Sequence, residues 1–560
     1  MERQIRPLGK TIVLAASTSE STEYQRNTWR QMLLATLPQK YARLMGTDWS
    51  CLTETNPDGT AKYVPNGLRV VESLLARQFP EEELAVCYPD QLDQFVGENT
   101  RVIGIHAHNP LGITFATDVY AGFYGNTCEP INAYEFRRLI QHPAIARHRH
   151  HLKVIVGGPG AWQIEHKGLQ DDWGIDTLVH GEAEMHVEEL FQTAVRGEDL
   201  PRRIECPSPP LEAIPTTRNR STFGVVEITR GCGRGCQFCS VALRDGKSLP
   251  LDHILENVRR QTAQGADTIM LTTEDLFLYE QGKRFATNTP ALKRLLYEVA
   301  AVAGVKHIML THGTMAPVVV QPHIVDELHL AADLSVTQHP ESTHPDQRYA
   351  MMFVGLETGS PRLFGKYMKG KAYPFRPNQW PEVVLKGMET MNKANWFPMC
   401  TFILGLPGET REDTKQSLDL LFALKGAKWS VIPTLFVPLD DTRLGDVEGA
   451  RIARLTDLQW EFFFTCWRYN IDFFRRQRSV HWKFNAGIPI YYYTLGRRTF
   501  GSAMKYPLFR LAHFPERYLR RHLYLDFSGH MEPRYHVPDH IEVPQPNVVS
   551  SIAPVRNQTP

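Results

Sequence analysis

Three cysteines within eight positions constrain this chain more than any other feature. The stretch VVEITRGCGRGCQFCS places an apolar run, expected to be a strand, directly before a loop that holds Cys232, Cys236 and Cys239. The interleaved glycines allow backbone to wrap closely around an inorganic cluster. Three thiolates can hold three irons of a 4Fe-4S cubane and leave the fourth iron open to a ligand. A structural zinc site is the alternative, but it usually takes four ligands in paired short spacings, and the sequence has no second cysteine pair.

Composition places the chain among folded proteins with several domains. Its 560 residues suggest about three or four domain-sized units. With 42% hydrophobic and 22% charged residues, it differs from disordered chains, and 62 basic against 61 acidic residues leave no overall nucleic-acid signature. Nine cysteines are too sparse for a disulfide scaffold, and no apolar run approaches the ~18 residues of a membrane span. We therefore expect a cytoplasmic protein with a metal site.

The pattern of apolar runs predicts an α/β architecture. Residues 1–205 alternate short apolar runs with helix-like stretches, which predicts a Rossmann-like domain whose strands lie at 11–15, 84–87, 101–105, 153–156 and 177–180. The proline-rich residues 206–217 predict a linker. Residues 218–440 predict a partial (β/α)6 barrel with strands at 223–228, 268–272, 307–310, 352–355, 401–404 and 430–436. Residues 441–536 are expected to be mainly helical, and 537–560 to be a disordered tail.

The CxxxCxxC spacing after the first barrel strand, with Phe238 before the last cysteine, resembles the radical S-adenosylmethionine (SAM) superfamily. In that family the open iron binds the amino and carboxylate groups of SAM, and an electron from the cluster cleaves it into methionine and a 5′-deoxyadenosyl radical. The resemblance implies cluster ligation by the three cysteines and SAM binding by residues of the motifs LTTEDLFLY, MFVGLETGS and FILGLPGETREDT. These residues are Phe238, near the adenine, with Glu274, Asp275, Glu357, Thr358 and Glu409.

Structural roles for these acidic residues stay open. Glu274 and Asp275 are placed as the N-cap of a helix would be. Glu409 precedes a helix capped by Thr410 with Asp413 three residues on, so it suits the first turn of that helix.

KVIVGGPGAWQ and IDTLVHGEAE resemble the fourth and fifth strands of the cobalamin-binding domain of one radical SAM subgroup, so the resemblance covers about residues 80 to 440. It implies that cobalamin is cradled at Gly157, Gly158, Gly160, Gly181 and Glu182, and that His106 and His108 face the ligand. A tight strand-to-helix connection and satisfied structural histidines are the alternatives. STSESTEYQRN stands where several cobalamin proteins have DxHxxG, so a lower histidine ligand is not expected. The histidine-rich run RHRHH at 147–151 is expected to be a solvated helix end.

The segment 467–523 carries twelve Lys or Arg against two acidic residues, interleaved with aromatic residues. This pattern suits anionic lipid headgroups, an RNA backbone, or an aromatic helical cap with solvated charges. RNA is disfavoured because tRNA-modifying radical SAM proteins usually carry a small RNA-binding β-barrel and further amino-terminal cysteines. A peripheral membrane association and a lipid-like or other small-molecule substrate are therefore expected, with flavodoxin or ferredoxin as electron donor.

Together these features favour a radical SAM enzyme that uses a 4Fe-4S cluster, SAM and cobalamin to methylate an unactivated carbon. Cobalamin-free radical coupling or cyclisation of membrane lipids is one alternative. A non-catalytic electron-transfer or cobalamin-sensing protein is the other.

Overall fold

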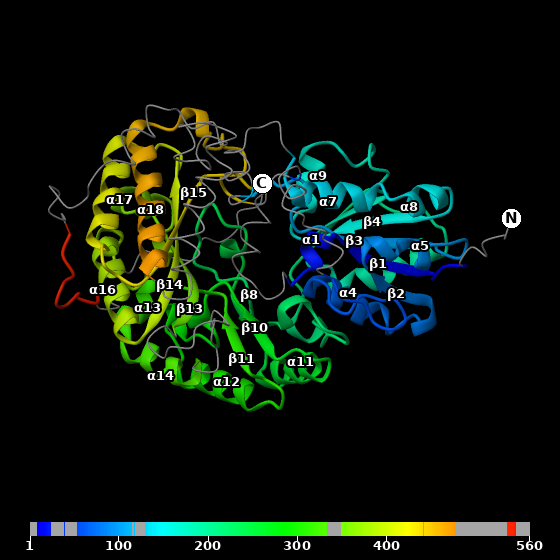
Figure 1. The fold of residues 1–560 in the computed structure, drawn as a ribbon, viewed down its shortest axis with the longest axis horizontal. Helices are drawn as coiled ribbons and strands as arrows, with labels where there is room; N and C mark the ends of the chain where they lie inside the picture. Colours follow the sequence, from blue (N-terminus) through cyan, green and yellow to red (C-terminus); the bar gives the residue numbers. More distant parts are fainter. Residues whose placement is uncertain are drawn as a thin grey trace, which may run out of the picture.

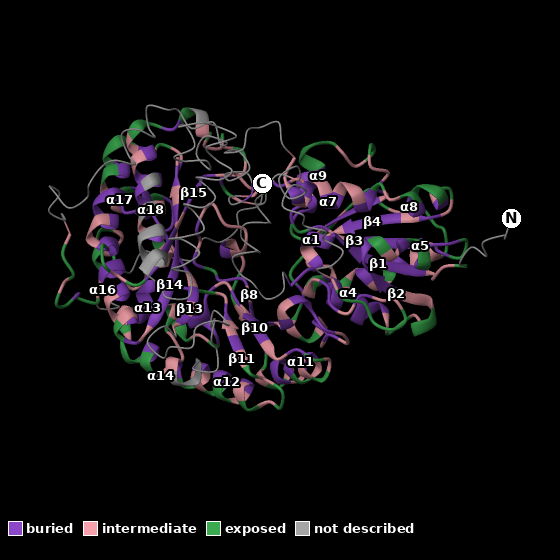
Figure 2. Cartoon of the chain, viewed as in Figure 1, coloured by how far each residue is buried: buried purple, intermediate pink, exposed green. Residues whose placement is uncertain are grey.

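The computed structural model describes residues 8–23, 39, 53–114, 117, 129–332, 349–440, 442–476 and 535–544. Figure 1 shows two α/β parts side by side, an amino-terminal domain in blue and cyan and a larger part in green to orange. The strands of both parts are largely buried, and the outer faces of the helices are exposed (Figure 2).

The amino-terminal domain is built on a six-stranded sheet in which every neighbouring pair is parallel, in the order β2-β1-β3-β4-β5-β6. The strands are β1 (Ile12–Ala16), β2 (Leu84–Cys87), β3 (Val102–His106), β4 (Lys153–Gly157), β5 (Thr177–Gly181) and β6 (Arg203–Cys206). The five expected strands are confirmed to within about one residue. The sequence analysis missed β6, because this edge strand reads RIEC and buries only its last residue.

Helices cover both faces of this sheet. On one face α4 (Asn66–Leu75) and α10 (Val187–Val195) pack against residues such as Leu14 and Ile155. On the other face, residues such as Val13 and Ile105 meet four helices: α5 (Leu92–Phe95), α7 (Ile131–Ile140), α8 (Pro143–His148) and α9 (Ala161–His166). Alternate residues of each strand pack into two separate hydrophobic cores, one on each face of the sheet. This is why the strands are continuous apolar runs in the sequence.

The second part is an open barrel of six parallel strands, one of which is interrupted and therefore carries the two labels β11 and β12. One sheet has the order β11-β10-β7 and the next β12-β13-β14-β15, with only Thr311 between β11 and β12. The strands are β7 (Val225–Glu227), β10 (Thr268–Thr272), β11 (His307–Leu310), β12 (His312–Gly313), β13 (Ala350–Glu357), β14 (Trp396–Leu404) and β15 (Ser430–Leu435). Each expected barrel strand is confirmed, and β7 and β15 form the open edges.

Helices cover the outside of the barrel: α11 (Leu251–Ala263), α12 (Thr289–Ala301), α13 (Met315–Val320), α14 (His323–Ala332), α15 (Pro361–Tyr367), α16 (Trp380–Lys393), α17 (Arg411–Ala423) and α18 (Asp457–Arg476). Trp380 is fully buried, stacks on Phe364 and donates a hydrogen bond of 3.2 Å to the Leu356 carbonyl. The helix α18 packs beside β15 and α17 (Figure 1). The Asn470 side chain fixes it there by bonding the amide and the carbonyl of Val431.

Residues 535–544 return to the barrel without forming a helix or a strand. Ile541 is buried in the barrel core, and the Gln379 side chain donates to the Glu542 carbonyl at 3.1 Å. The expectation of disorder from 537 is therefore wrong for residues 537–544, because one apolar side chain docks this stretch. Most of the aromatic, basic segment (477–523) lies outside the described residues. No helix in the described ranges combines the length and apolarity of a membrane span.

Candidate active site

The cysteine loop lies at the mouth of the barrel. It starts after β8 (Thr229–Arg230), whose antiparallel partner is β9 (Lys247–Ser248). All three loop glycines adopt the left-handed conformation, with φ of +68° at Gly231, +69° at Gly233 and +73° at Gly235. Side-chain-bearing residues rarely adopt this conformation, so the loop can wrap tightly only because glycine stands at these positions.

The three thiols have the character of ligands to a soft metal cluster. Cys232 and Cys236 are buried, Cys239 is half-buried, and all three are free of disulfides. Burial raises the pKa of Cys232 and of Cys236 to about 12, so these thiols stay protonated until a metal displaces the proton. The other described cysteines lie elsewhere, in β2, β6, β14 and α18. A glycine-rich loop with three thiol donors, and no fourth among the described residues, fits a 4Fe-4S cluster with one open iron.

A buried acid–base pair lies beside the thiols. The register of β13 against β14 shifts between Gly355 and Glu357, and Glu357 takes a φ of +65°. This bulge turns the Glu357 carboxylate toward the Lys371 ammonium, with which it forms an ion pair, and toward the Thr401 hydroxyl at 3.1 Å. A side chain at Gly355 would overlap both members of the pair. The charge of Lys371 also acts on Cys236 and Cys239, where it lowers the pKa of each thiol against the effect of burial.

Sequence reasoning singled out Glu357 but missed Lys371. The motif containing Glu357 ends at Ser360, and Lys371 follows eleven residues later in a 3-10 turn (Lys369–Ala372). Gly370 in this turn packs against the backbone of Arg234 in the cysteine loop. Gly370 was the only local clue that this turn packs closely against another segment, and the sequence alone did not show that this segment is the cysteine loop.

Asp275 and Arg234 form a second buried pair that anchors the cysteine loop. The Asp275 side chain is 1% exposed and accepts hydrogen bonds from Arg234 at 2.8 and 3.0 Å and from the Thr314 hydroxyl at 3.0 Å. It also caps the amide of Phe277 at 3.2 Å. Its oxygens are therefore engaged within the protein, which favours the capping role for Asp275 over direct contact with SAM.

Glu274 differs from its neighbour. It follows β10, and the Thr229 hydroxyl donates a long hydrogen bond of 3.4 Å to its carboxylate. Burial raises the pKa of Glu274 to about 7, and the negative charge of Glu227 adds to this rise. An acidic side chain with spare hydrogen-bonding capacity at the end of a barrel strand is suited to accept from an ammonium group.

Thr358 and Glu409 form hydrogen bonds that connect neighbouring elements of the barrel. Thr358 is buried and lies 3.2 Å from the Ser417 hydroxyl of α17. Glu409 accepts from the Gly405 amide, from Thr414 at 2.8 Å and from Gln459 at 3.1 Å, so it joins the β14–α17 turn to α18. These contacts favour the structural interpretation of Glu409. Phe238 is half-buried against the barrel core, and its contact with adenine stays a prediction.

Close packing explains three of the four amino-terminal glycines, Gly158, Gly160 and Gly181, and leaves little room at Gly157. A Cβ at Gly158 would lie 2.7 Å from the Ala107 carbonyl, and one at Gly160 would overlap the His108 carbonyl. A Cβ at Gly181 would overlap the Cys206 carbonyl of β6, and one at Gly157 would lie 3.3 Å from Val179. This supports the tight-connection interpretation, and a role of these glycines toward a ligand stays a prediction.

The carboxyl ends of β1 and β3 meet where the strand order reverses, the place at which parallel α/β sheets bind ligands. Glu20 fills part of this edge: it lies 2.8 Å from His106 and accepts from the His108 amide at 3.0 Å, while the His108 side chain is exposed. Thr18 and Ser21 are buried beside it, and their hydroxyls have no partner in the described part of the chain. Unpartnered hydroxyls at this edge fit a polar ligand group such as a phosphate or an amide.

Ion pairs connect this edge of the sheet to the cysteine loop. Glu182, directly after β5, pairs with Arg230 and with Arg244 at 2.9 Å each, and Glu184 pairs with Arg230 at 2.6 Å. Arg230 immediately precedes the loop and Arg244 follows it. Glu182 thus forms ion pairs between the two domains, and the carboxyl edge of the sheet lies next to the cysteine loop.

Comparison with known proteins agrees with this architecture. Residues 226–421 match the model of the radical SAM superfamily. The threonylcarbamoyladenosine tRNA methylthiotransferase of Drosophila melanogaster is 25% identical over 270 residues, which cover 45% of this chain and 42% of that protein. The tRNA-2-methylthio-N(6)-dimethylallyladenosine synthase of Aquifex aeolicus (strain VF5) is 27% identical over 256 residues, 44% of this chain and 52% of that protein. The chain spans about half the length of these relatives.

The fold extends the likeness beyond the barrel. Two structures of the radical SAM methyltransferase TsrM from Kitasatospora setae match 78% of this chain, with TM-scores of 0.51 and 0.52 at 16% identity. One was determined with cobalamin and a [4Fe-4S] cluster, the other with tryptophan substrate and a SAM analogue, and the match covers 77% and 75% of the two chains. Residues 226–421 therefore form a radical SAM domain, and over the wider chain the likeness to TsrM is one of fold.

Proposed function

We propose that this protein is a cobalamin-dependent radical SAM methyltransferase that methylates an unactivated carbon of a lipid-like or other small molecule. The observation that carries the proposal is the contact of Glu182 and Glu184 with Arg230 and Arg244. It brings the ligand-binding edge of a parallel sheet next to a loop with three free thiols. Two cofactors held at these places would lie close enough to act on one substrate.

The residues divide into three groups by what they would hold. Cys232, Cys236 and Cys239 would hold the 4Fe-4S cluster, and Glu274 would accept from the ammonium group of SAM. Thr18 and Ser21, with the exposed His108, would hold polar groups of cobalamin. When bound, these cofactors supply the electron, the sulfonium and the methyl group that the reaction needs.

The Glu357–Lys371 pair would set the charge beside the cluster. Lys371 is a cation 11% exposed next to two thiol ligands, and Glu357 holds it in place. A fixed positive charge favours the anionic thiolate form and so stabilises the cluster in the reduced state as well. An external electron carrier such as flavodoxin or ferredoxin would supply the electron.

Methylation of tRNA has less support, although the two relatives named above modify tRNA. Cys87 and Cys206, the described cysteines of the amino-terminal domain, lie at opposite edges of its sheet, and burial raises the pKa of both thiols. They cannot form a second cluster site together. The basic segment that suggested an anionic partner lies mostly outside the described residues, so its role as a lipid-facing surface stays a proposal.

The test is transfer of label from methyl-labelled SAM. Cluster-loaded protein would be incubated without oxygen with a reductant, methylcobalamin and, in separate arms, a lipid extract, a pool of polar metabolites and bulk tRNA. Label in the lipid or metabolite arm, lost without cobalamin and in Cys236→Ala, supports the proposal. Label in tRNA alone, or 5′-deoxyadenosine formed without any need for cobalamin, would overturn it and favour a tRNA enzyme or a radical coupling enzyme. A chain that binds the cofactors but consumes no SAM would be a sensor or an electron carrier.

A further inference from the structure

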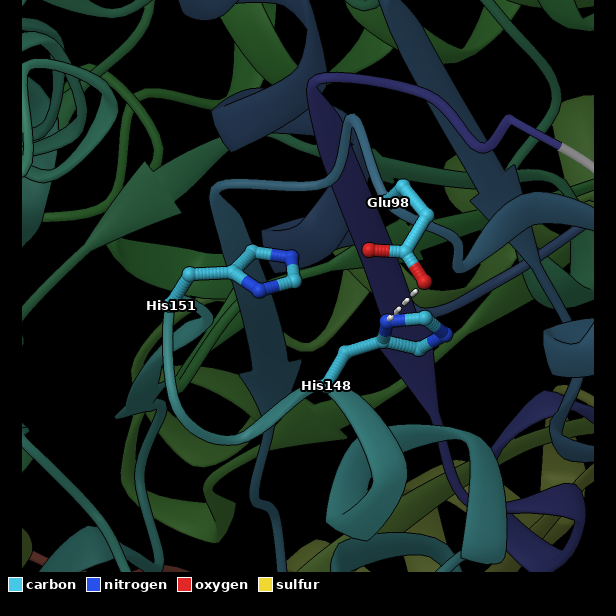
Figure 3. A group of neighbouring side chains, drawn as sticks. All are labelled: Glu98, His148 and His151. Carbon is cyan, nitrogen blue, oxygen red and sulfur yellow. Dashed lines mark ion pairs between the residues drawn. The ribbon is translucent and has the colours of Figure 1, made fainter.

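Three side chains gather at the edge of the amino-terminal sheet that lies opposite the proposed cofactor site. Glu98 lies in the turn before β3, His148 is the last residue of α8, and His151 lies in the turn before β4 (Figure 3). The amino ends of parallel strands share one edge of a sheet, whereas the cysteine loop abuts the carboxyl edge. This group is therefore separate from the candidate active site.

The histidine run at 147–151 was expected to be a solvated helix end, and the structure shows this to be wrong for His148. His148 is 4% exposed, and its Nδ1 atom is buried without a hydrogen-bond partner among the described residues. The closest carboxylate oxygen, Oε1 of Glu98, lies 3.8 Å away, too far for a hydrogen bond. The Nε2 atom of His151 is likewise buried and unpartnered. Two buried imidazole nitrogens without described partners in one place require an explanation, and a capacity to bind a metal ion is one.

The third histidine of the run orients His151. Nε2 of the exposed His150 lies 2.9 Å from Nδ1 of His151. If Nδ1 of His151 donates in this contact, its Nε2 carries the lone pair that a metal needs. Histidines that ligate metals commonly use their second nitrogen in this way.

The group offers two imidazole donors and one carboxylate donor. Arg147, the nearest cation on the same helix, pairs with Asp93 at 3.6 Å. The Glu98 side chain is 59% exposed and can turn toward the two rings.

We propose that Glu98, His148 and His151 form a binding site for a divalent transition metal of the Zn²⁺ class. One ligand atom from each residue lies within 4.8 Å of the others, and ligands of tetrahedral zinc are about 3.3 Å apart, so a small contraction would complete the site. Two imidazoles and one carboxylate are a donor set that zinc accepts, with a fourth position left for water. The metal would join the turn before β3 to the turn before β4 and brace this edge of the sheet.

The test is zinc binding by the full chain with its cluster loaded, so that the three cysteines are occupied. Titration calorimetry should give one Zn²⁺ per chain, and zinc X-ray absorption should show nitrogen and oxygen ligands at about 2.0 to 2.1 Å without sulfur. Glu98→Gln and His151→Ala should each weaken binding at least ~10-fold. Glu82→Gln, which removes an exposed carboxylate elsewhere in the same domain, should leave it unchanged.

His148→Ala removes a buried side chain and can unfold the domain. The proposal is therefore tested with variants of Glu98 and His151, which are more exposed. Zinc should also raise the thermal midpoint of the wild-type chain and not that of Glu98→Gln. Sulfur in the zinc coordination shell, absence of a stoichiometric site, or equal affinity in Glu98→Gln, His151→Ala and wild type would each overturn the proposal.

Discussion

The buried pair between Arg234 and Asp275 offers the sharpest test of how the cysteine loop is held. Arg234 lies between two of the three cysteines, its side chain is 3% exposed, and Asp275 is the acidic partner that neutralises it. Asp275→Asn keeps the size of the side chain but removes its charge. The Arg234 cation is then left buried and unpaired, which is far more costly than the loss of an exposed ion pair.

The magnitude follows from the burial of both partners. Breaking a buried pair by removing one charge costs about 3 to 5 kcal/mol. For a unit of roughly 200 residues, each kcal/mol lowers the thermal midpoint by about 2 to 4 °C, so we expect the midpoint of the barrel to fall by roughly 6 to 20 °C. Because Arg234 lies inside the cysteine motif, we also expect Asp275→Asn to bind less iron.

The assay compares Asp275→Asn with Glu274→Gln, the same class of change one residue earlier. Thermal unfolding and iron content would be measured on both variants after anaerobic cluster loading. The side chain of Glu274 receives a long hydrogen bond from Thr229, so Glu274→Gln should keep its iron and a midpoint no lower than that of the wild type while it weakens SAM binding. If Asp275→Asn loaded iron normally and only SAM affinity fell, Asp275 would be a SAM ligand and the anchoring argument would be refuted.

Three further predictions follow from other parts of the site. Cys236→Ala should abolish both the ~4 irons per chain and SAM cleavage, whereas Cys400→Ala should keep both, measured by iron analysis and chromatography; a cluster that survives Cys236→Ala would contradict the ligand assignment. Glu182→Gln should increase proteolytic cleavage between the domains while iron content stays constant, because Arg230 and Arg244 each lose a partner; unchanged cleavage would show that this contact does not hold the domains together. The folded chain holds the Glu274 proton more tightly than the unfolded chain does, with the pKa raised from 4.5 to about 7, so wild-type stability should fall as pH rises through this window. Thermal unfolding from pH 4.5 to 8 should show this fall, which Glu274→Gln should lack; the same slope in both proteins would assign it to other groups.

Local patterns predicted the strands well, because a strand buried on both faces must be a short apolar run. The strand at 268–272 and the strand at 307–310 were predicted to the residue. The edge strand β6 was missed because its one buried residue gives no such run. The docking of Ile541 was missed for a related reason: a single apolar residue in a proline-rich tail has no pattern, and only the barrel surface gives it a place to bind.

The sequence by itself determined the cluster loop, since cysteine spacing and the glycines between them act over a few residues of chain. It also determined the order of strands and helices, through the periodicity of apolar residues. Only the tertiary structure decided what each acidic residue does. Asp275 meets Arg234 across 41 residues of sequence, and Glu357 meets Lys371 across 14. Such pairs form because folding buries charges that must then find partners, and the distance along the chain does not show which partner is near.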